Sequence, residues 1–207
     1  MEGKEYIYMQ KKLSDNIEIA WINIQDEIES ADAILVSSEK TLVFKFAMEL
    51  AKLYNCKNIV IDFEVKLYED INGSDKYLDL LVYELERPIE KYAIEFKAPM
   101  KSAKGNSNQT VTRKKIYKDI ARLSYLKEQH KDIHNGYFLM ITNENPYFNS
   151  STKRDNKFDT ANNIEADLKL FKKDYHLKND YNFKFIWKNI NKYSIKGKFA
   201  WLKHIKV

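Results

Sequence analysis

The stretch that decides the fold is residues 76–99, KYLDLLVYELERPIEKYAIEFKAP. Residues 77–85 and 92–98 are rich in β-branched, aromatic and leucine side chains, and Arg87-Pro88 lies between them. Alternating and apolar residues of this kind are typical of strands, and proline interrupts a strand ladder. The pattern therefore predicts two antiparallel strands joined by a short turn.

Charged residues interrupt both of these apolar strands. Asp79 lies in the first strand, and Glu95 and Lys97 lie in the second. Side chains two apart on a strand share a face, so Glu95 and Lys97 point the same way. A turn centred on Arg87 or Pro88 places Asp79 opposite Glu95 or Lys97, whereas a slip of one residue moves it to the other face. Such charges are costly to bury unless they bind something, such as a divalent metal ion.

The spacing of these residues also resembles a known signature. Asp79, fifteen intervening residues and then Glu95-Phe96-Lys97 resemble the motif of the PD-(D/E)XK nuclease superfamily, which includes restriction endonucleases and Holliday-junction resolvases. Leu78 stands where the superfamily's name has proline, a position at which the superfamily varies. The resemblance implies that Asp79, Glu95 and the Phe96 carbonyl bind Mg²⁺, with Mn²⁺ as a substitute. Lys97 would then orient the attacking water or help to deprotonate it.

A helix before the hairpin supplies a further candidate carboxylate. Residues 39–54 have the apolar period of an amphipathic helix, with Ser37 or Ser38 as the N-cap. Glu49 falls inside the apolar stripe, and by itself this favours a helix-edge side chain that extends to solvent. The run FAMELAKL is similar, however, to the first helix of archaeal-type resolvases, where a glutamate before a leucine reaches the metal. The resemblance implies that role for Glu49, with Glu39 as the alternative.

The surrounding elements follow a recognisable order. Residues 58–68 and 136–142 are predicted strands, and residues 111–130 form a predicted helix that Thr110 or Thr112 caps. Over residues 39–142 the order is α-β-β-β-α-β. This is the core order of the restriction-endonuclease fold, which is a mixed α/β fold with a central mixed sheet flanked by helices.

The segments outside this core are additions at both ends. Residues 5–30 mix apolar alternation with acids and fit either a strand or a helix. Residues 160–175 are predicted to form a helix, and residues 183–187 a late strand. The chain ends in the basic, aromatic sequence FAWLKHIKV. At 207 residues the whole chain is expected to be one domain with a substantial core.

Charge is unevenly distributed along the chain, whose net charge is +5. Residues 14–39 hold seven acids and no Lys or Arg, whereas residues 91–131 hold eleven Lys or Arg against three acids. Residues 177–207 hold eight Lys against one Asp. Basic regions that alternate with aromatics suit a polyanion, here DNA, although any single Lys can simply solvate an exposed face. The residues expected to contact the DNA backbone are Lys101, Lys104, Arg113, Lys114 and Lys118, and Arg122 is expected on the same exposed helix side.

Other sequence features bound the location and the cofactors. Cys56 is the single cysteine, so a disulfide framework is excluded and a reducing compartment is expected. The first residues lack the apolar core of a signal peptide, and no apolar run approaches membrane-spanning length. Glycine-rich phosphate and dinucleotide loops are absent, so no organic cofactor is expected. We expect a cytoplasmic protein without a membrane partner.

Three functional hypotheses follow. The first is a Mg²⁺-dependent endonuclease that hydrolyses phosphodiester bonds in DNA, for which type II restriction is the first biological setting. Junction resolvases and RecB-like exonucleases are further members of this class. The second hypothesis is a nuclease-like module that binds nucleic acid or a protein without cutting. In the third, the acidic segment 14–39 docks onto the basic tail, which gives a homodimer or a self-masked protein and is compatible with either activity.

Overall fold

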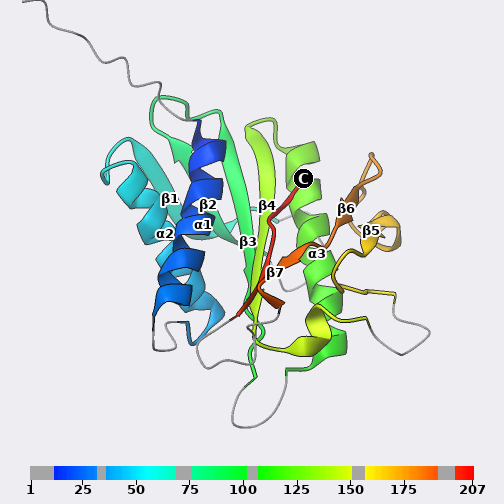
Figure 1. Ribbon diagram of the computed structural model, residues 1–207. Coiled ribbons are helices and arrows are strands. Elements are labelled where there is room, and N and C mark those ends of the chain that lie inside the picture. Colours follow the sequence, from blue (N-terminus) through cyan, green and yellow to red (C-terminus); the bar gives the residue numbers. More distant parts are fainter. Residues whose placement is uncertain (1–11, 32–35, 69–75, 102–106, 151–156, 191–198) are drawn as a thin grey trace, which may run out of the picture.

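The computed structural model describes residues 12–31, 36–68, 76–101, 107–150, 157–190 and 199–207. Its centre is a seven-stranded mixed sheet with the strand order β1-β2-β3-β4-β8-β7, in which β9 also pairs with β4. Helices α1 and α2 cover one face of this sheet, and α3 covers the other (Figure 1). The predicted mixed α/β class, with a central sheet flanked by helices, is confirmed.

The predicted hairpin is present at the centre of the sheet. Strands β2 (Tyr77–Glu84) and β3 (Lys91–Lys97) are antiparallel, and their register pairs Leu80 with Ile94 and Leu81 with Ala93. Both strands are largely buried because helices lie on each face. The hairpin therefore forms where the apolar runs and the turn predict it.

The flanking strands complete the predicted order. Strand β1 (Ile59–Lys66) pairs antiparallel with β2, and β4 (Ile133–Thr142) pairs parallel with β3. A parallel neighbour requires a crossover, and α3 (Gln109–Gln129) makes it on one face of the sheet. The elements α2, β1, β2, β3, α3 and β4 thus follow one another as α-β-β-β-α-β.

Helices α1 (Leu13–Ser30) and α2 (Glu39–Leu53) lie on the same face of the sheet. The ambiguity over residues 5–30 is resolved as a helix over its described part, since Ile17, Ile24 and Ile28 recur at helical spacing and are fully buried. Helix α2 begins after Ser38, whose hydroxyl accepts a hydrogen bond from a backbone N–H in the first turn.

Two boundaries around α3 differ from the sequence-based prediction. The N-cap is Asn108, whose side-chain Oδ1 accepts a hydrogen bond from the Val111 N–H at 3.3 Å, and neither Thr110 nor Thr112 is the N-cap. Asn is among the best N-caps, and it precedes both threonines in the chain. The predicted stripe of Ile116, Ile120 and Leu123 is fully buried.

Gly136, predicted as the first residue of a strand, lies inside β4, which begins at Ile133. A Cβ atom at this position would come within 2.8 Å of Leu123 Cβ on α3 and within 2.8 Å of Val207 Cγ2. Glycine therefore allows the helix, the strand and the C-terminal segment to approach closely.

The predicted helix over residues 160–175 is wrong. The chain there forms the short strand β5 (Glu165–Asp167) and the 3₁₀ helix η2 (Lys169–Phe171). Asn163 has the left-handed φ of 66°, and the Asp167 carboxylate accepts a hydrogen bond from the backbone N–H two residues later at 3.0 Å. Both features are typical of Asn and Asp in turns, and they interrupt a continuous helix.

The remaining elements are short, and the predicted strand over residues 183–187 is divided between two sheets. Strand β6 pairs with β5 in a separate two-stranded sheet, whereas β7, β8 and β9 extend the main sheet. Their bounds are η1 Asn145–Tyr147, β6 Asn182–Lys184, β7 Trp187–Lys188, β8 Ala200–Leu202 and β9 Ile205–Lys206.

The C-terminal segment contacts the acidic helix α1 of the same chain. Trp201 is fully buried and makes an edge-on contact with Trp21, with ring centroids 5.1 Å apart. The Trp21 indole N–H donates to the Leu202 carbonyl at 3.2 Å, and Glu18 lies 3.3 Å from His204. The aromatic residues of the tail are therefore core residues of the sheet.

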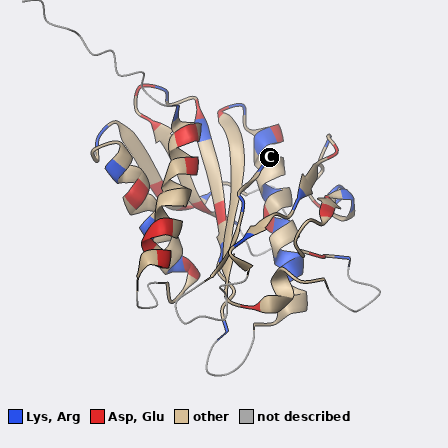
Figure 2. Cartoon of the chain, viewed as in Figure 1, with Lys and Arg blue, Asp and Glu red and all other residues tan. Residues whose placement is uncertain are grey.

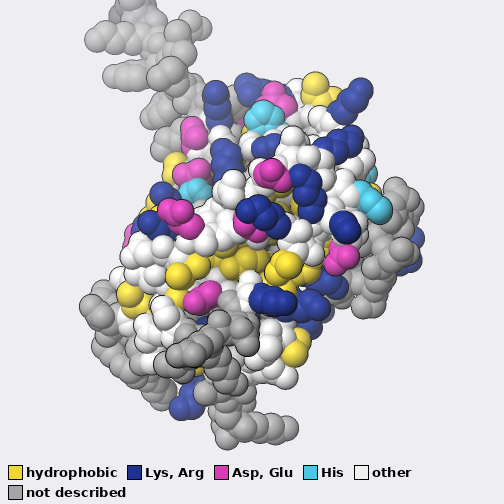
Figure 3. All heavy atoms as spheres, turned by 90° about the vertical axis from the view of Figure 1, so that its right-hand side faces the viewer, with side chains coloured by type: hydrophobic (Ala, Val, Ile, Leu, Met, Phe, Trp, Pro, Cys, Tyr) yellow, Lys and Arg dark blue, Asp and Glu magenta, His cyan; other side chains and the backbone are white. Residues whose placement is uncertain are grey.

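Charge follows the layers of the fold. Acidic residues are prominent on α1, and basic residues are prominent on α3 (Figure 2). On the side of the molecule where β5 and β6 lie, basic side chains are interspersed with acidic ones and with an apolar band (Figure 3). The described residues contain no helix that is long and apolar enough to cross a membrane.

Candidate functional site

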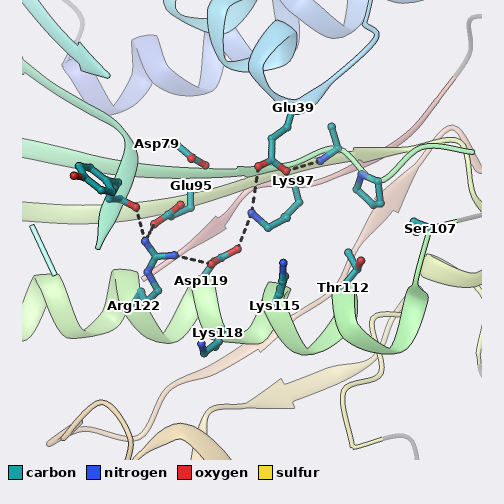
Figure 4. Close-up of a pocket in the computed structure, with 13 residues that line it drawn as sticks. Glu39, Asp79, Glu95, Lys97, Ser107, Thr112, Lys115, Lys118, Asp119 and Arg122 are labelled. Atoms are coloured by element: carbon teal, nitrogen blue, oxygen red, sulfur yellow. Dashed lines mark hydrogen bonds and ion pairs between the residues drawn. The ribbon is translucent and has the colours of Figure 1, made fainter. Parts of the chain in front are cut away.

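A pocket of about 450 Å³ opens between the N-terminus of α2, the central strands β2 and β3, and helix α3 (Figure 4). Each of these elements contributes charged side chains to it. The charged residues that line the pocket are Glu39, Asp79, Glu95, Lys97, Lys115, Lys118, Asp119 and Arg122.

Asp79 and Glu95 lie on the same side of the sheet, as the sequence predicts. The register of β2 and β3, continued by one pair, places Asp79 opposite Glu95, which corresponds to a turn centred on Arg87. The Asp79 carboxylate accepts a hydrogen bond from the Phe96 backbone N–H at 2.8 Å through Oδ2. This hydrogen bond fixes the Asp79 side chain at the end of the ladder, where the pocket begins.

Lys97 lies at the centre of the carboxylates. Its Nζ is 2.9 Å from Asp119 Oδ2 and 3.5 Å from Glu39 Oε1, and it donates to the Phe96 carbonyl at 2.8 Å. Burial alone would lower the pKa of the Lys97 ammonium, but the carboxylates of Asp119 and Glu39 outweigh it and raise that pKa. Lys97 therefore stays protonated, which favours charge stabilisation and water orientation over proton abstraction.

Glu95 is almost completely buried, with 2% of its surface exposed. Its Oε1 lies 3.1 Å from Arg122 Nη2 and accepts a hydrogen bond from the Tyr68 hydroxyl at 2.9 Å. Burial raises the pKa of the Glu95 carboxyl, and the neighbouring Asp119 and Asp79 add to the rise while Arg122 opposes it. Oε2 of Glu95 takes no part in these two contacts.

Arg122 is buried in the site. The sequence-based prediction, which placed it on the exposed side of the helix, is wrong. Its guanidinium is 3.1 Å from Asp119 Oδ1 and lies over the Tyr68 ring, with 4.1 Å between the guanidinium carbon and the ring centroid. It also donates to the Tyr77 carbonyl. Four sets of contacts hold this side chain because a buried charge must be paired.

The glutamate of α2 that reaches the pocket is Glu39, and the assignment of Glu49 is corrected. Glu49 accepts a hydrogen bond from Asn23 of α1 at 2.8 Å and pairs with Lys52 at 3.0 Å, and it does not line the pocket. Ten residues along a helix correspond to about 15 Å, so the two glutamates cannot serve the same site.

Glu39 is the first residue of α2 and points into the pocket. Its Oε2 accepts a hydrogen bond from the Ala98 N–H at 3.3 Å, and its Oε1 faces Lys97. Desolvation in the pocket wall raises the pKa of Glu39, against the lowering effect of Lys97, and Asp79 and Asp119 add to the rise.

Of the described lysines predicted to contact DNA, one lines the pocket and two are exposed outside it. Lys118 lines the pocket, and Lys114 is exposed on the same helix without lining it. Lys101, in the chain after β3, is exposed and does not line the pocket. Lys115 also lines the pocket and was missed, although it lies one helical turn before Asp119.

Arg113 is the exception among the described candidates. It is buried, with 7% of its surface exposed, and donates to the Pro146 carbonyl. Its guanidinium holds α3 against the segment after β4, so its predicted contact with DNA is corrected to a structural role. Lys104 lies outside the described residues.

Hydrogen bonds hold the segment between β3 and α3 at Lys101 and at Ser107. The Lys101 N–H donates to Asn143 Oδ1 at 2.8 Å, and the Ser107 N–H donates to Glu144 Oε1 at 3.0 Å. Glu144 is only 2% exposed. Ser107 lines the pocket, so the loop after β4 positions one of its walls.

Among the residues of the site that were not predicted from sequence are Tyr68, Lys115 and Asp119. A signal was present for Asp119, because it lies three residues before Arg122 on a helix and such a spacing brings opposite charges together. Tyr68 follows β1 by two residues, and only the tertiary fold brings it to Glu95.

The donor atoms of the pocket suit a hard cation. Among the described residues no three His, Cys, Asp or Glu side chains are arranged to hold one metal ion. Mg²⁺, however, keeps several waters and binds through one or two carboxylates. Oδ1 of Asp79 and Oε2 of Glu95 lie outside the hydrogen bonds described above. The oxygen donors are thus of the type that Mg²⁺ prefers.

Comparisons with known proteins leave the family open. No family model matches the chain, and no curated protein matches it significantly. The resemblance to the PD-(D/E)XK superfamily therefore stays a prediction, which rests on the residue pattern of Asp79, Glu95 and Lys97 and on the order of the elements that carry them.

Proposed function

We propose that this chain is a Mg²⁺-dependent nuclease of the PD-(D/E)XK type that hydrolyses phosphodiester bonds in DNA. One observation carries the proposal: carboxylates from α2, β2 and β3 converge with a lysine side chain in one pocket. These residues are Glu39, Asp79, Glu95 and Lys97. The α3 wall of the same pocket presents Lys115 and Lys118, which suits a phosphate backbone.

Asp79 and Glu95 would hold the metal ion, joined by the Phe96 carbonyl, and Glu39 takes the place first assigned to Glu49. When bound, Mg²⁺ or Mn²⁺ supplies Lewis acidity and makes a nucleophilic water available near neutral pH. The Phe96 carbonyl accepts a hydrogen bond from Lys97 and the Phe96 N–H donates one to Asp79, so the backbone of this one residue links the Asp79 and Lys97 side chains.

The protein residues would stabilise charge and orient the water. The raised pKa keeps Lys97 protonated, so its ammonium offsets the charge of the phosphate and orients the water by donating a hydrogen bond. Lys115 and Lys118 would hold neighbouring phosphates through long-range attraction. Lys101 and Lys114, both exposed, would extend this contact along the backbone.

The test is cleavage of plasmid, linear and branched DNA with Mg²⁺ or with EDTA. We expect the wild type to cut only with the metal, and Lys97→Ala and Glu95→Ala to lose about a hundredfold or more of that activity. Lys173→Ala is the matched control, because it removes an exposed charge remote from the pocket. If the wild type cuts no DNA with Mg²⁺ or Mn²⁺, the proposal fails.

A second candidate is a nuclease-like module that binds nucleic acid without cutting. The observation in its favour is the ion pair between Glu95 and Arg122, which already neutralises the charge of the buried carboxylate. A metal that binds the folded state raises the melting temperature, whereas a module without a metal site shows no such rise. Thermal melting of the wild type with and without Mg²⁺ therefore separates the two candidates.

The biological setting proposed first is restriction in the cytoplasm. Segments outside residues 39–142 leave chain for sequence recognition and for a homodimer, and two-fold dimers are the commonest oligomers. The comparison of plasmid with branched DNA in the same assay distinguishes restriction from junction resolution.

A further inference from the structure

A second pocket of about 400 Å³ adjoins the candidate active site. The two pockets share Glu39 and Asp79, so a ligand in one lies beside a ligand in the other. This volume lies within the usual range of pockets for small ligands. Its remaining lining residues are Lys40, Val43, Phe44, Phe63 and Glu64.

The walls of this second pocket are two exposed phenylalanines from different elements. Phe44 of α2 is 59% exposed, and Phe63 of β1 is 50% exposed. Neither ring belongs to an aromatic pair within the part of the chain that the structure describes. Val43, which precedes Phe44, is buried and forms the apolar floor. The pocket therefore offers aromatic surface that no other ring covers.

Strand β1 is distorted where it borders this pocket. Glu64 has a φ of 49°, which is rare for a residue other than glycine. The ladder with β2 is described on both sides of it, at Phe63–Leu80 and Val65–Leu78. Backbone strain of this kind persists only where the surrounding fold maintains it, and it clusters at active sites and ligand sites.

Charges at the rim complete the surface. Lys40 Nζ lies 3.1 Å from Glu64 Oε1, and both side chains are largely exposed. An exposed ion pair is weak, so Lys40 can turn to a phosphate at little cost. The carboxylate of Glu64 is an acceptor that suits the exocyclic amines of bases.

We propose that this pocket binds an unpaired base of single-stranded DNA next to the phosphodiester in the active pocket. The inference rests on the proposed function, and it names the substrate class of that site. Bases stack on exposed aromatic side chains, and Lys40 at the rim complements the backbone charge. A base held within a duplex cannot enter a pocket, so the aromatic walls select an unpaired strand or a base displaced from the helix.

The test is binding of a single-stranded oligonucleotide and of a duplex of equal length, measured by fluorescence anisotropy in EDTA. EDTA removes catalysis, so the result does not depend on whether the protein cuts DNA. We expect Phe63→Ala and Phe44→Ala each to weaken single-strand binding by roughly 5- to 150-fold, the range found for loss of one stacked base. Duplex binding should change by less than about twofold, and Phe63→Trp should retain single-strand binding.

Met48→Ala is the matched control, because Met48 lies one turn after Phe44, is 46% exposed and does not line the pocket. It should bind both forms of DNA like the wild type. Equal losses for single strand and duplex, or a loss for Met48→Ala as large as that for Phe44→Ala, would overturn the inference. So would a wild type that binds no single strand, or Phe variants that change only the oligomeric state in sedimentation, which would assign the surface to a second copy of the chain.

A cleavage assay then separates this inference from the proposed function. With Mg²⁺, the Phe63→Ala variant should lose cutting of single strands while it retains nicking of supercoiled plasmid. A wild type that binds single strands through Phe63 but cuts no DNA would refute the nuclease and leave the base-binding pocket in place.

Discussion

Glu39 and Glu49 lie on the same helix, and their partners give them different chemistry. Glu39 faces Lys97 in the pocket, whereas Glu49 is held by Asn23 and Lys52 away from it. Glu39→Gln should lower DNA cleavage by about a hundredfold, because a carboxylate near the metal site is lost. Glu49→Gln is the matched control and should remain within about twofold of the wild type. Rates that fall equally in both variants, or only in Glu49→Gln, would contradict the placement of Glu39.

The same Glu39→Gln variant should change the pH dependence of stability. The pKa of Glu39 is raised in the folded protein, chiefly by desolvation, so its charge lowers the free energy of unfolding at pH values above that raised pKa. Well below the ordinary glutamate pKa of about 4.3 the group is protonated in both states and has no such effect.

Glu39→Gln should therefore raise the free energy of unfolding near neutral pH and lose that advantage in acid. The gain should not exceed about 1 kcal/mol, because 39% of the side chain is exposed and solvent screens the charge. Urea unfolding at about pH 8 and about pH 3.5 measures the difference. A Gln variant that is less stable at the higher pH would show that the ion pair with Lys97 outweighs desolvation.

At the scale of residues, the sequence predicts the position of a site residue where the period of its own strand or helix determines it. Positions that depend on tertiary contacts are not predicted. The strand period and the turn at Arg87 place Asp79, Glu95 and Lys97 in one pocket. The choice between glutamates on α2 depends instead on how that helix sits on the sheet. Glu49 lies in the apolar stripe, yet that part of the stripe faces α1.

At the scale of elements, helix α3 has three faces with different structural roles. One side packs into the core, a second presents Asp119 and Arg122 to the buried carboxylates, and a third presents lysines. Sequence periodicity identifies the apolar side but does not distinguish the other two, because a buried arginine and an exposed one have the same spacing.

This division of α3 predicts different results for two basic residues. Lys118→Ala should reduce the slope of log affinity for DNA against log salt by about 0.9, because one phosphate contact is lost. Arg113→Ala should leave the slope unchanged and lower the free energy of unfolding by about 1–3 kcal/mol, since it leaves the Pro146 carbonyl without its donor.

The measurements are anisotropy titrations of duplex DNA at several salt concentrations, together with urea unfolding. Lys173→Ala is the control for loss of an exposed charge, and it should alter neither quantity. A salt slope that changes for Arg113→Ala and not for Lys118→Ala would reverse the assignment of the two residues.

The elements themselves were predictable where long apolar periods specify them. The α-β-β-β-α-β order follows from runs of seven or more periodic residues, and each such element is found. Residues 160–175 have a helical apolar spacing as well, but Asn163 and Asp167 form local turns that prevent a continuous helix there. Short strands such as β8 and β9 depend on their pairing with β4, which no local pattern reveals.

At the scale of the whole molecule, the acidic and the basic segments of the sequence contact each other within the fold. The acidic helix α1 lies against the basic C-terminal segment, with Glu18 next to His204 and Trp21 bonded to Leu202. This contact within one chain uses part of the surface that a homodimer formed by the same two segments would need. The lysines proposed to contact DNA, Lys115 and Lys118, lie on α3 and take no part in this contact.

The C-terminal segment is joined to the centre of the fold at Gly136. The Val207 N–H donates to the Gly136 carbonyl at 3.0 Å, and the Gly136 N–H donates to the Val207 carbonyl at 3.2 Å. Gly136→Ala would bring a methyl group within 2.8 Å of Leu123 on α3 and of Val207. We expect it to lower the free energy of unfolding by about 1–3 kcal/mol, the usual cost of overpacking.

A double-mutant cycle tests whether this cost arises where the three segments meet. Val207→Ala removes one of the two clashing groups, so Gly136→Ala should be less destabilising in the Val207→Ala background than in the wild type. The expected coupling is about 0.5 kcal/mol or more, because Leu123 remains in place and relief is incomplete. Urea unfolding of the four proteins measures it. Strictly additive losses would mean that the new methyl group is accommodated by a shift of α3 alone, and that the C-terminal segment does not restrain β4.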